Sequence, residues 1–133
     1  MDGSTSHSFA GLEHAEFMVL TTYRRNGDAV PTTVWFAEAD GILYVTTAFE
    51  AGKTKRIRTN PHVTVAPSDQ VGNVQGAIVP AQGRILEPHE YEPAIQALQR
   101  KYGEQFTQLT ARMDASRPAG SRIYLAIMPL HSA

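Results

Sequence analysis

The chain has 133 residues, no cysteine and nearly balanced charge, with 12 lysines and arginines against 13 aspartates and glutamates. This length fits one domain, which we take to span residues 1–133. The charge balance argues against a nucleic-acid partner, because modules that bind polyanions usually carry a clear basic excess. The lack of cysteine excludes disulfide frameworks, thiolate metal sites and cysteine nucleophiles.

The N-terminal segment Met1–Ser8 is small and polar, without the charged start and apolar run of a secretory signal. No apolar stretch of the chain approaches the ~20 residues that are needed to span a bilayer. Together with the absence of cysteine, these features predict a cytoplasmic protein with no membrane partner.

The first half of the chain reads as a series of strands. Val, Thr, Tyr, Phe and Trp are frequent in three segments, 17–24, 30–36 and 42–47, as is typical of strands. The turn signals Asn26-Gly27-Asp28 and Asp40-Gly41 tolerate positive φ, so we predict an antiparallel meander. Apolar residues occur on both faces of the middle strand, which predicts a sheet covered on both sides, as in a closed barrel or a dimer.

The second half adds helices to this sheet. The further predicted elements are, in chain order, a short helix over 51–60, a strand over 62–66, one or two strands over 74–86, a helix over 90–102 with Gly103 as its C-cap, a helical piece over 106–113 and a last strand over 121–128. The fold class that follows is mainly β with minor α, with six or so antiparallel strands and short helices.

The junction between the third predicted strand and the first helix is the most informative part for function. Thr46 and Thr47 end the strand, and a small-residue turn leads into a helix with four cations. Threonine hydroxyls, free amides at a helix N-terminus and a lysine in the first turn can together hold a phosphate by charge-assisted hydrogen bonds. The alternative for this basic helix is a solvated surface face.

Helical geometry sorts the four cations. With Ile57 as the inward residue, Lys53 lies about 40° from it, Arg56 and Arg58 lie roughly 100° to either side, and Lys55 points nearly opposite. We therefore place Lys53 first and Arg56 second as ligands of a phosphate.

The sequence carries no pattern of another catalytic apparatus. The histidines have no metal-ligand spacing, and we expect no metal site. No Gly-x-Ser-x-Gly elbow and no pair of acids stands out. The five histidines are His7, His14, His62, His89 and His131.

Three runs of the chain, taken in order, resemble the pyridoxamine 5'-phosphate oxidase-like superfamily. These runs are Val30-Pro31-Thr32-Thr33-Val34-Trp35-Phe36, Leu43-Tyr44-Val45-Thr46-Thr47 and the stretch from Gly52 to Pro67. More narrowly, the chain is similar to the branch of deazaflavin (coenzyme F420)-dependent enzymes, in which Ser-Gly-Lys-Val-Lys-Arg commonly stands at 51–56. The later Arg84-Ile85-Leu86 and Lys101-Tyr102 also fit. Ala51 departs from the pattern by removing one hydroxyl.

The resemblance implies an FMN-binding-protein-like split β-barrel that forms a homodimer with two cofactor sites at the subunit interface. The backbone that would run along the flavin-like ring belongs to Thr32, Thr33, Val34 and Trp35. The phosphate would be held by Thr46, Thr47 and Lys53, with Arg56 as the second cation. The Trp35 ring would stack on the cofactor or pack in the core or the dimer interface. The chain ends at Ala133, without the family's usual tail, so we expect a more open site.

The function that the resemblance implies is hydride transfer between coenzyme F420 and a small organic substrate, with the protein supplying position and electrostatics. F420 carries a phosphodiester and an anionic oligoglutamate tail, so the extra cations Lys55, Arg56 and Arg58 favour it over FMN. Two alternatives are an FMN-binding oxidoreductase of the pyridoxamine 5'-phosphate oxidase type and a non-catalytic flavin- or heme-binding dimeric module.

Overall fold

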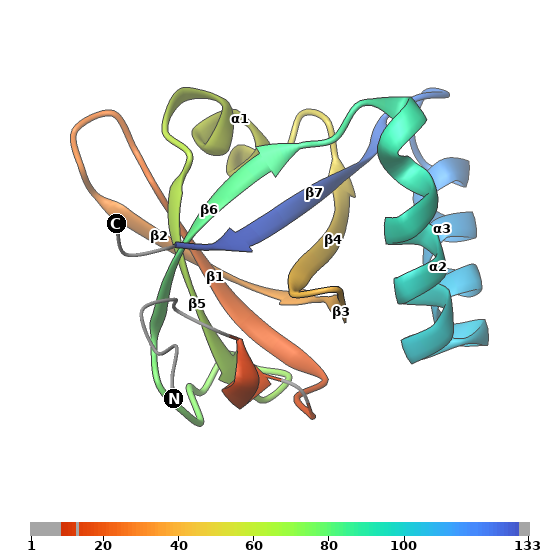
Figure 1. Cartoon of the computed structure of the whole chain (residues 1–133). Helices are drawn as coiled ribbons and strands as arrows, with labels where there is room; N and C mark the ends of the chain where they lie inside the picture. The colour runs from red at the N-terminus through yellow and green to blue at the C-terminus, as the bar shows by residue number, and fades with distance from the viewer. Residues whose placement is uncertain (1–8, 13, 131–133) are drawn as a thin grey trace.

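The computed structural model describes residues 9–12 and 14–130 (Figure 1). The expectations for Met1–Ser8, for His7 and His131 and for the end of the chain concern residues outside this part. The elements are η1 (Ala10–Leu12), β1 (Phe17–Tyr23), β2 (Ala29–Trp35), β3 (Ala37–Ala39), β4 (Ile42–Ala48), α1 (Gly52–Thr59), β5 (His62–Ser68), β6 (Val79–Ile85), η2 (Pro88–Glu90), α2 (Tyr91–Tyr102), α3 (Glu104–Ala115) and β7 (Arg122–Pro129).

The strands of the described part form one antiparallel sheet in the order β2-β1-β5-β6-β7-β4-β3. β2 and β3 follow each other in the chain with only Phe36 between them, yet they lie at opposite ends of this order. The chain itself therefore links the two edges, and the sheet curls into an incomplete barrel (Figure 1). The predicted split β-barrel with minor helix is confirmed.

The predicted three-strand meander is wrong at its second junction. β1 pairs with β2, and β3 pairs with β4 through the Asp40-Gly41 turn, whose φ angles are 55° and 81°. The other side of β4 pairs with β7 and not with β2. After Phe36 the middle strand changes partner, so one segment serves both halves of the barrel. Pairing of this kind depends on distant segments and has no local turn signal.

The predicted strand over 74–86 begins too early. β6 starts only at Val79, and Val74 makes a single bridge to Ser68. In the intervening loop the Asp69 carboxylate accepts the amides of Val71 and Asn73 at 3.0 and 2.9 Å. Side-chain bonds of this type offer the backbone an alternative to a strand ladder, which explains the shorter strand.

The two C-terminal helices follow each other directly. Gly103, with a φ of 58°, ends α2 as predicted. α3 extends beyond the predicted 106–113 on both sides, to Glu104–Ala115. Within residues 9–12 and 14–130, no helix combines the length and apolar character that a membrane crossing requires.

Two buried apolar clusters lie on the two faces of the sheet. The inner cluster fills the barrel and includes Leu12 of η1 and Ile57 of α1. Along β4, Leu43 and Val45 point into this cluster while Tyr44 joins the outer one, as the period of a strand requires. The helices α2 and α3 pack outside the sheet beside β4 and β7 (Figure 1), so the second face of these strands is covered by the chain's own helices.

One ion pair at the start of α2 should make the fold less stable in acid. The Glu90 carboxylate accepts two bonds from the Arg84 guanidinium, both of 3.0 Å, and the amide of Glu87 at 2.9 Å. These bonds, with those from Arg84 the largest cause, lower the pKa of Glu90 from 4.5 to about 2. Because the folded-state pKa is the lower one, the contribution of Glu90 is present above about pH 4.5 and is lost as the pH falls towards about 2.

We therefore expect Glu90→Gln to flatten the dependence of the urea midpoint on pH between about pH 5 and about pH 2.5. Glu104→Gln is the matched control, because the exposed Glu104 side chain makes no hydrogen bond within the described chain. If Glu90→Gln keeps the full acid dependence of the wild type, the pair does not contribute as described.

Candidate functional site

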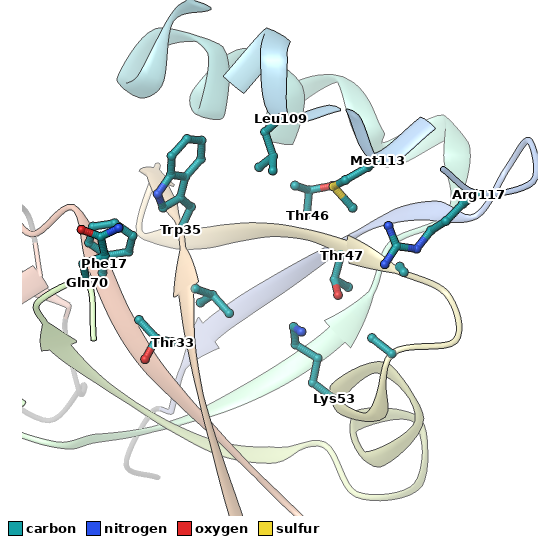
Figure 2. A pocket seen from close by; sticks show the side chains of 13 residues that line it. Phe17, Thr33, Trp35, Thr46, Thr47, Lys53, Gln70, Leu109, Met113 and Arg117 are labelled. Carbon is teal, nitrogen blue, oxygen red and sulfur yellow. The ribbon is translucent and has the colours of Figure 1, made fainter. Parts of the chain in front are cut away.

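An open cleft of about 450 Å³ lies between the barrel and α3 (Figure 2). This volume is in the range of small-molecule and cofactor sites. Strands β1, β2 and β4, helices α1 and α3, the β5–β6 loop and the α3–β7 turn all contribute side chains. The lining residues are Phe17, Thr33, Val34, Trp35, Thr46, Thr47, Ala48, Ala51, Lys53, Gln70, Leu109, Met113 and Arg117.

The cleft has one apolar end and one cationic end. Figure 2 shows Trp35 and Leu109 at one end, while Lys53, Thr47 and Arg117 gather at the other. None of the described residues that line the cleft is acidic. A ligand with an apolar ring system and an anionic group at its other end would match this division.

Thr47 presents a buried polar group to the cationic end. Its side chain is 5% exposed, points from β4 towards Lys53 (Figure 2), and makes no hydrogen bond within the described chain. The neighbouring Thr46 uses its hydroxyl to donate to the Ile123 carbonyl at 3.0 Å. An unsatisfied buried hydroxyl costs about 1–3 kcal/mol, so a ligand oxygen that accepts from Thr47 would be stabilised. Of the two predicted threonines, Thr47 has the free donor.

Lys53 lies in the first turn of α1, partly exposed, with Thr47 in front of it (Figure 2). Burial, and next the repulsion from Arg56, lower the pKa of its ammonium group. No side chain caps the helix at Ala51, so the amides of the first turn lack a side-chain partner. A partly buried cation beside uncapped amides is an arrangement that an anion stabilises. The predicted orientation of the helix is confirmed, since Lys55 is exposed.

Arg56 does not reach this cleft. Its Nε donates to the buried Thr22 hydroxyl at 2.6 Å. The guanidinium also lies against Gly52, where an added Cβ would come within 2.7 Å of Nη1. Arg56 borders a separate basic hollow lined by Tyr23, Arg24, Arg25, Lys55, Arg56 and Thr59. The structure thus separates the two cations that the sequence pattern had put forward together.

The edge strand β2 brings part of its predicted segment to the cleft. Thr33 and Trp35 are partly exposed and line it, and Val34 borders it from the barrel core. Thr32 does not line the cleft. Among the described strands β2 pairs with β1 alone, so alternate backbone groups along its other edge have no partner in the described sheet. These groups remain available to the polar edge of a ligand.

The Trp35 ring packs against α2. It stacks on the Tyr102 ring with centroids 4.3 Å apart and planes 6° from parallel. Trp35 therefore combines core packing with a place in the cleft wall, two roles that the sequence presented as alternatives.

Sequence reasoning missed the wall that α3 and its following turn contribute. Phe106, Leu109 and Met113 recur at a helical spacing, with Phe106 buried and the other two in the cleft wall. That apolar period was readable in the sequence. Gln70 and Arg117 carried no such signal, because their position depends on a loop and on the pairing of β4 with β7.

The chain matches one family model in sequence and several solved structures in fold. A family model described as pyridoxamine 5'-phosphate oxidase matches residues 5–131. No curated protein sequence matches the chain.

Three solved structures, among others, resemble the chain. A candidate pyridoxamine 5'-phosphate oxidase from Listeria innocua is 19% identical with a TM-score of 0.63, over 90% of this chain and 88% of that chain. The heme storage protein HutZ from Vibrio cholerae is 15% identical with a TM-score of 0.65, over 89% and 84%. An F420 reductase is 17% identical with a TM-score of 0.58, over 98% and 96%. At these identities the likeness shows the fold alone.

Proposed function

Because the chain belongs to the pyridoxamine 5'-phosphate oxidase family, we propose that it is an oxidoreductase that holds a flavin-type cofactor in this cleft through the cofactor's phosphate. The observation that carries the proposal is the Thr47 hydroxyl, which is buried and has no hydrogen-bond partner among the described residues, in front of the partly buried Lys53. Both groups fit an oxyanion, and both lie at one end of a cleft of suitable size.

We propose one orientation for the cofactor in the cleft. Lys53, Thr47 and the first-turn amides of α1 would hold the phosphate, and the ring system would lie towards Trp35 and Leu109. The free edge of β2 would donate and accept hydrogen bonds at the polar edge of the ring. When bound, the cofactor supplies hydride-transfer chemistry, and the chain supplies position and charge.

We further propose coenzyme F420 rather than FMN as the cofactor, with a small organic molecule as substrate. The support is the separate basic hollow, which is lined in part by Arg24, Arg25 and Lys55. This hollow lies on the side of α1 that faces away from Lys53. None of the three forms an ion pair within the described chain. An anionic tail that extends past the phosphate would meet these cations, whereas the single terminal phosphate of FMN would end near Lys53.

Binding can be measured through the single tryptophan of the chain. Trp35 lines the cleft, so its fluorescence should be quenched on titration with F420, and with FMN if F420 fails. We expect a Kd in the micromolar range or tighter, about −8 kcal/mol or more favourable. If neither cofactor binds at high micromolar concentration, the oxidoreductase proposal is wrong. If a cofactor binds, hydride transfer from its reduced form to a panel of small acceptors is then measured. Such transfer distinguishes an enzyme from a protein that only carries the cofactor.

We also propose a homodimer with the cleft at its interface. β2 is an edge strand beside the cleft, and the loop that supplies Gln70 also exposes Val71 (79%) and Val74 (48%). Unpaired strand edges and exposed apolar side chains are features that association covers. Light scattering should give twice the chain mass of 14.6 kDa. A monomer at micromolar concentration would remove the basis for a shared site.

A further inference from the structure

Arg117 lies with Lys53 at the cationic end of the cleft, but it comes from a part of the chain remote in sequence from Lys53. We propose that Arg117 binds the cofactor's phosphate opposite Lys53 and so selects phosphorylated over phosphate-free flavins. This inference rests on the proposed function. It assigns to Arg117 the role that the sequence pattern gave to Arg56.

The placement of the two cations favours a shared anion. Arg117 extends from the α3–β7 turn towards Thr47, and Lys53 approaches the same hydroxyl from α1 (Figure 2). The phosphodiester of F420 carries one negative charge and two free acceptor oxygens, and the phosphate monoester of FMN carries nearly two negative charges and three such oxygens. Two cations that flank one hydroxyl donor match that charge, and the planar guanidinium of Arg117 can bind two phosphate oxygens at once.

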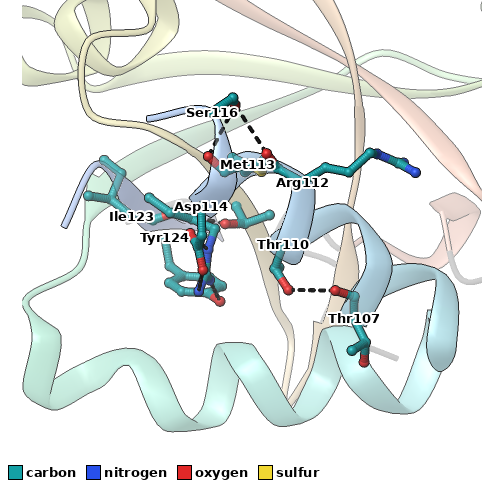
Figure 3. Close-up of polar contacts among 10 residues, drawn as sticks. Thr107, Thr110, Arg112, Met113, Asp114, Ser116, Ile123 and Tyr124 are labelled. Carbon is teal, nitrogen blue, oxygen red and sulfur yellow. Dashed lines mark hydrogen bonds and ion pairs between the residues drawn. The ribbon is translucent and has the colours of Figure 1, made fainter. Parts of the chain in front are cut away.

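Arg117 has no competing partner in the described chain. The acidic side chain near this end of α3 is Asp114, and Arg122 of β7 holds it with bonds of 2.9 and 3.2 Å. Arg122 also donates to the Tyr124 hydroxyl, which lies beside Asp114 in Figure 3. Arg122 is thus the structural cation of this region, and no carboxylate in the cleft has to be displaced from Arg117 before an anion binds.

The backbone that carries Arg117 is held on both sides. Pro118 follows it and restricts the backbone of Arg117 to extended conformations. Before it, the Ser116 hydroxyl donates to the Arg112 carbonyl at 3.1 Å (Figure 3). After it, the amide of Ser121 donates to the Pro118 carbonyl at 3.2 Å. Only the Arg117 side chain therefore has to become ordered when the phosphate binds, which limits the entropic cost.

Titration of the full-length protein with FMN and with riboflavin, which lacks the phosphate, tests the assignment. Arg117→Gln should weaken FMN binding by about 10-fold or more, the scale of one hydrogen bond to a charged group, and leave riboflavin binding unchanged. Arg112→Gln removes a charge from the exposed face of α3 outside the cleft, and should change both affinities by less than about twofold. The same comparison is made with F420 and its phosphate-free deazaflavin.

Two results would overturn the assignment while leaving the proposed function intact. In one, Arg117→Gln binds FMN and F420 as tightly as the wild type. In the other, it loses phosphorylated and phosphate-free cofactors equally, which indicates a distorted cleft. A wild-type protein that binds none of the four compounds would instead overturn the proposed function and this inference with it. Thermal unfolding of Arg117→Gln and Arg112→Gln establishes that both variants are folded.

Discussion

Lys53→Ala should weaken binding of the phosphate-bearing cofactor by roughly 1.5 to 3 kcal/mol, the range for a hydrogen bond to a charged group. Lys55→Ala should cost well under ~1 kcal/mol, as exposed charges do. The two lysines share one helix, but Lys53 lines the cleft in front of Thr47 and Lys55 is exposed on another face. The measurement is the cofactor titration followed by Trp35 fluorescence.

Salt separates a positioned contact from a general field. Both substitutions remove one positive charge, so a field effect would weaken binding about equally and fade in both variants as the ionic strength rises. A direct contact from Lys53 would keep the two variants apart at high salt. A lysine stem can also stabilise a fold by covering apolar surface, so thermal unfolding is compared in parallel. Equal losses in Lys53→Ala and Lys55→Ala at matched stability would contradict the phosphate site.

The parts of the molecule that were predictable are those fixed by local periods and turn chemistry. The strand period separates the faces of β4, the Asp40-Gly41 dipeptide makes the positive-φ turn, and Gly103 ends α2. The helical period of α1 places Lys53 nearer the core than Lys55. Each of these rests on residues within one or two turns of each other, where the chain itself sets the geometry.

The second cation that lies near Lys53 in the cleft could not be predicted from such local patterns. A helical wheel gives the angle between Lys53 and Arg56 but not which neighbouring element each angle faces, and Arg56 turns to Thr22 of β1. Arg117 reaches the cleft because β7 pairs with β4, with Thr47 opposite Ile123. That pairing joins segments distant in sequence and is decided by the barrel as a whole.

Local sequence patterns also could not predict that helices cover the outer face of the sheet. The apolar outer face of the sheet predicted either a closed barrel or a dimer, and over β4 the cover comes from Leu98 and Tyr102 of α2 together with Phe106 of α3. β2 lies at one end of the described sheet, so its outer edge has no neighbouring strand within residues 9–12 and 14–130. The argument for a dimer therefore no longer rests on the whole sheet. It rests on the edge strand β2, which borders the cleft.

Tyr102→Phe should lower the free energy of unfolding by about 1–3 kcal/mol, the cost of leaving a buried polar group without its partner. The Tyr102 hydroxyl lies 2.6 Å from the Glu16 carbonyl and 2.8 Å from that of Phe36, and it accepts the Phe36 amide at 3.0 Å. Burial raises the pKa of Tyr102, so the hydroxyl keeps its proton. Phenylalanine retains the ring that stacks on Trp35, so the substitution isolates the hydroxyl.

The loss of stability in Tyr102→Phe should arise at the junction between β2 and β3, where the chain passes from one half of the barrel to the other. Without the hydroxyl, the Phe36 amide has no partner, while the Phe36 carbonyl keeps the Lys101 ammonium at 2.7 Å. Tyr91→Phe is the matched control on the same helix, because the Tyr91 hydroxyl makes no hydrogen bond in the described chain, and it should change stability by at most about 0.5 kcal/mol. Urea unfolding measures both. Similar losses in Tyr102→Phe and Tyr91→Phe would show that the Tyr102 hydroxyl does not hold this junction, and that the stacked rings alone fix the end of β2 beside the cleft.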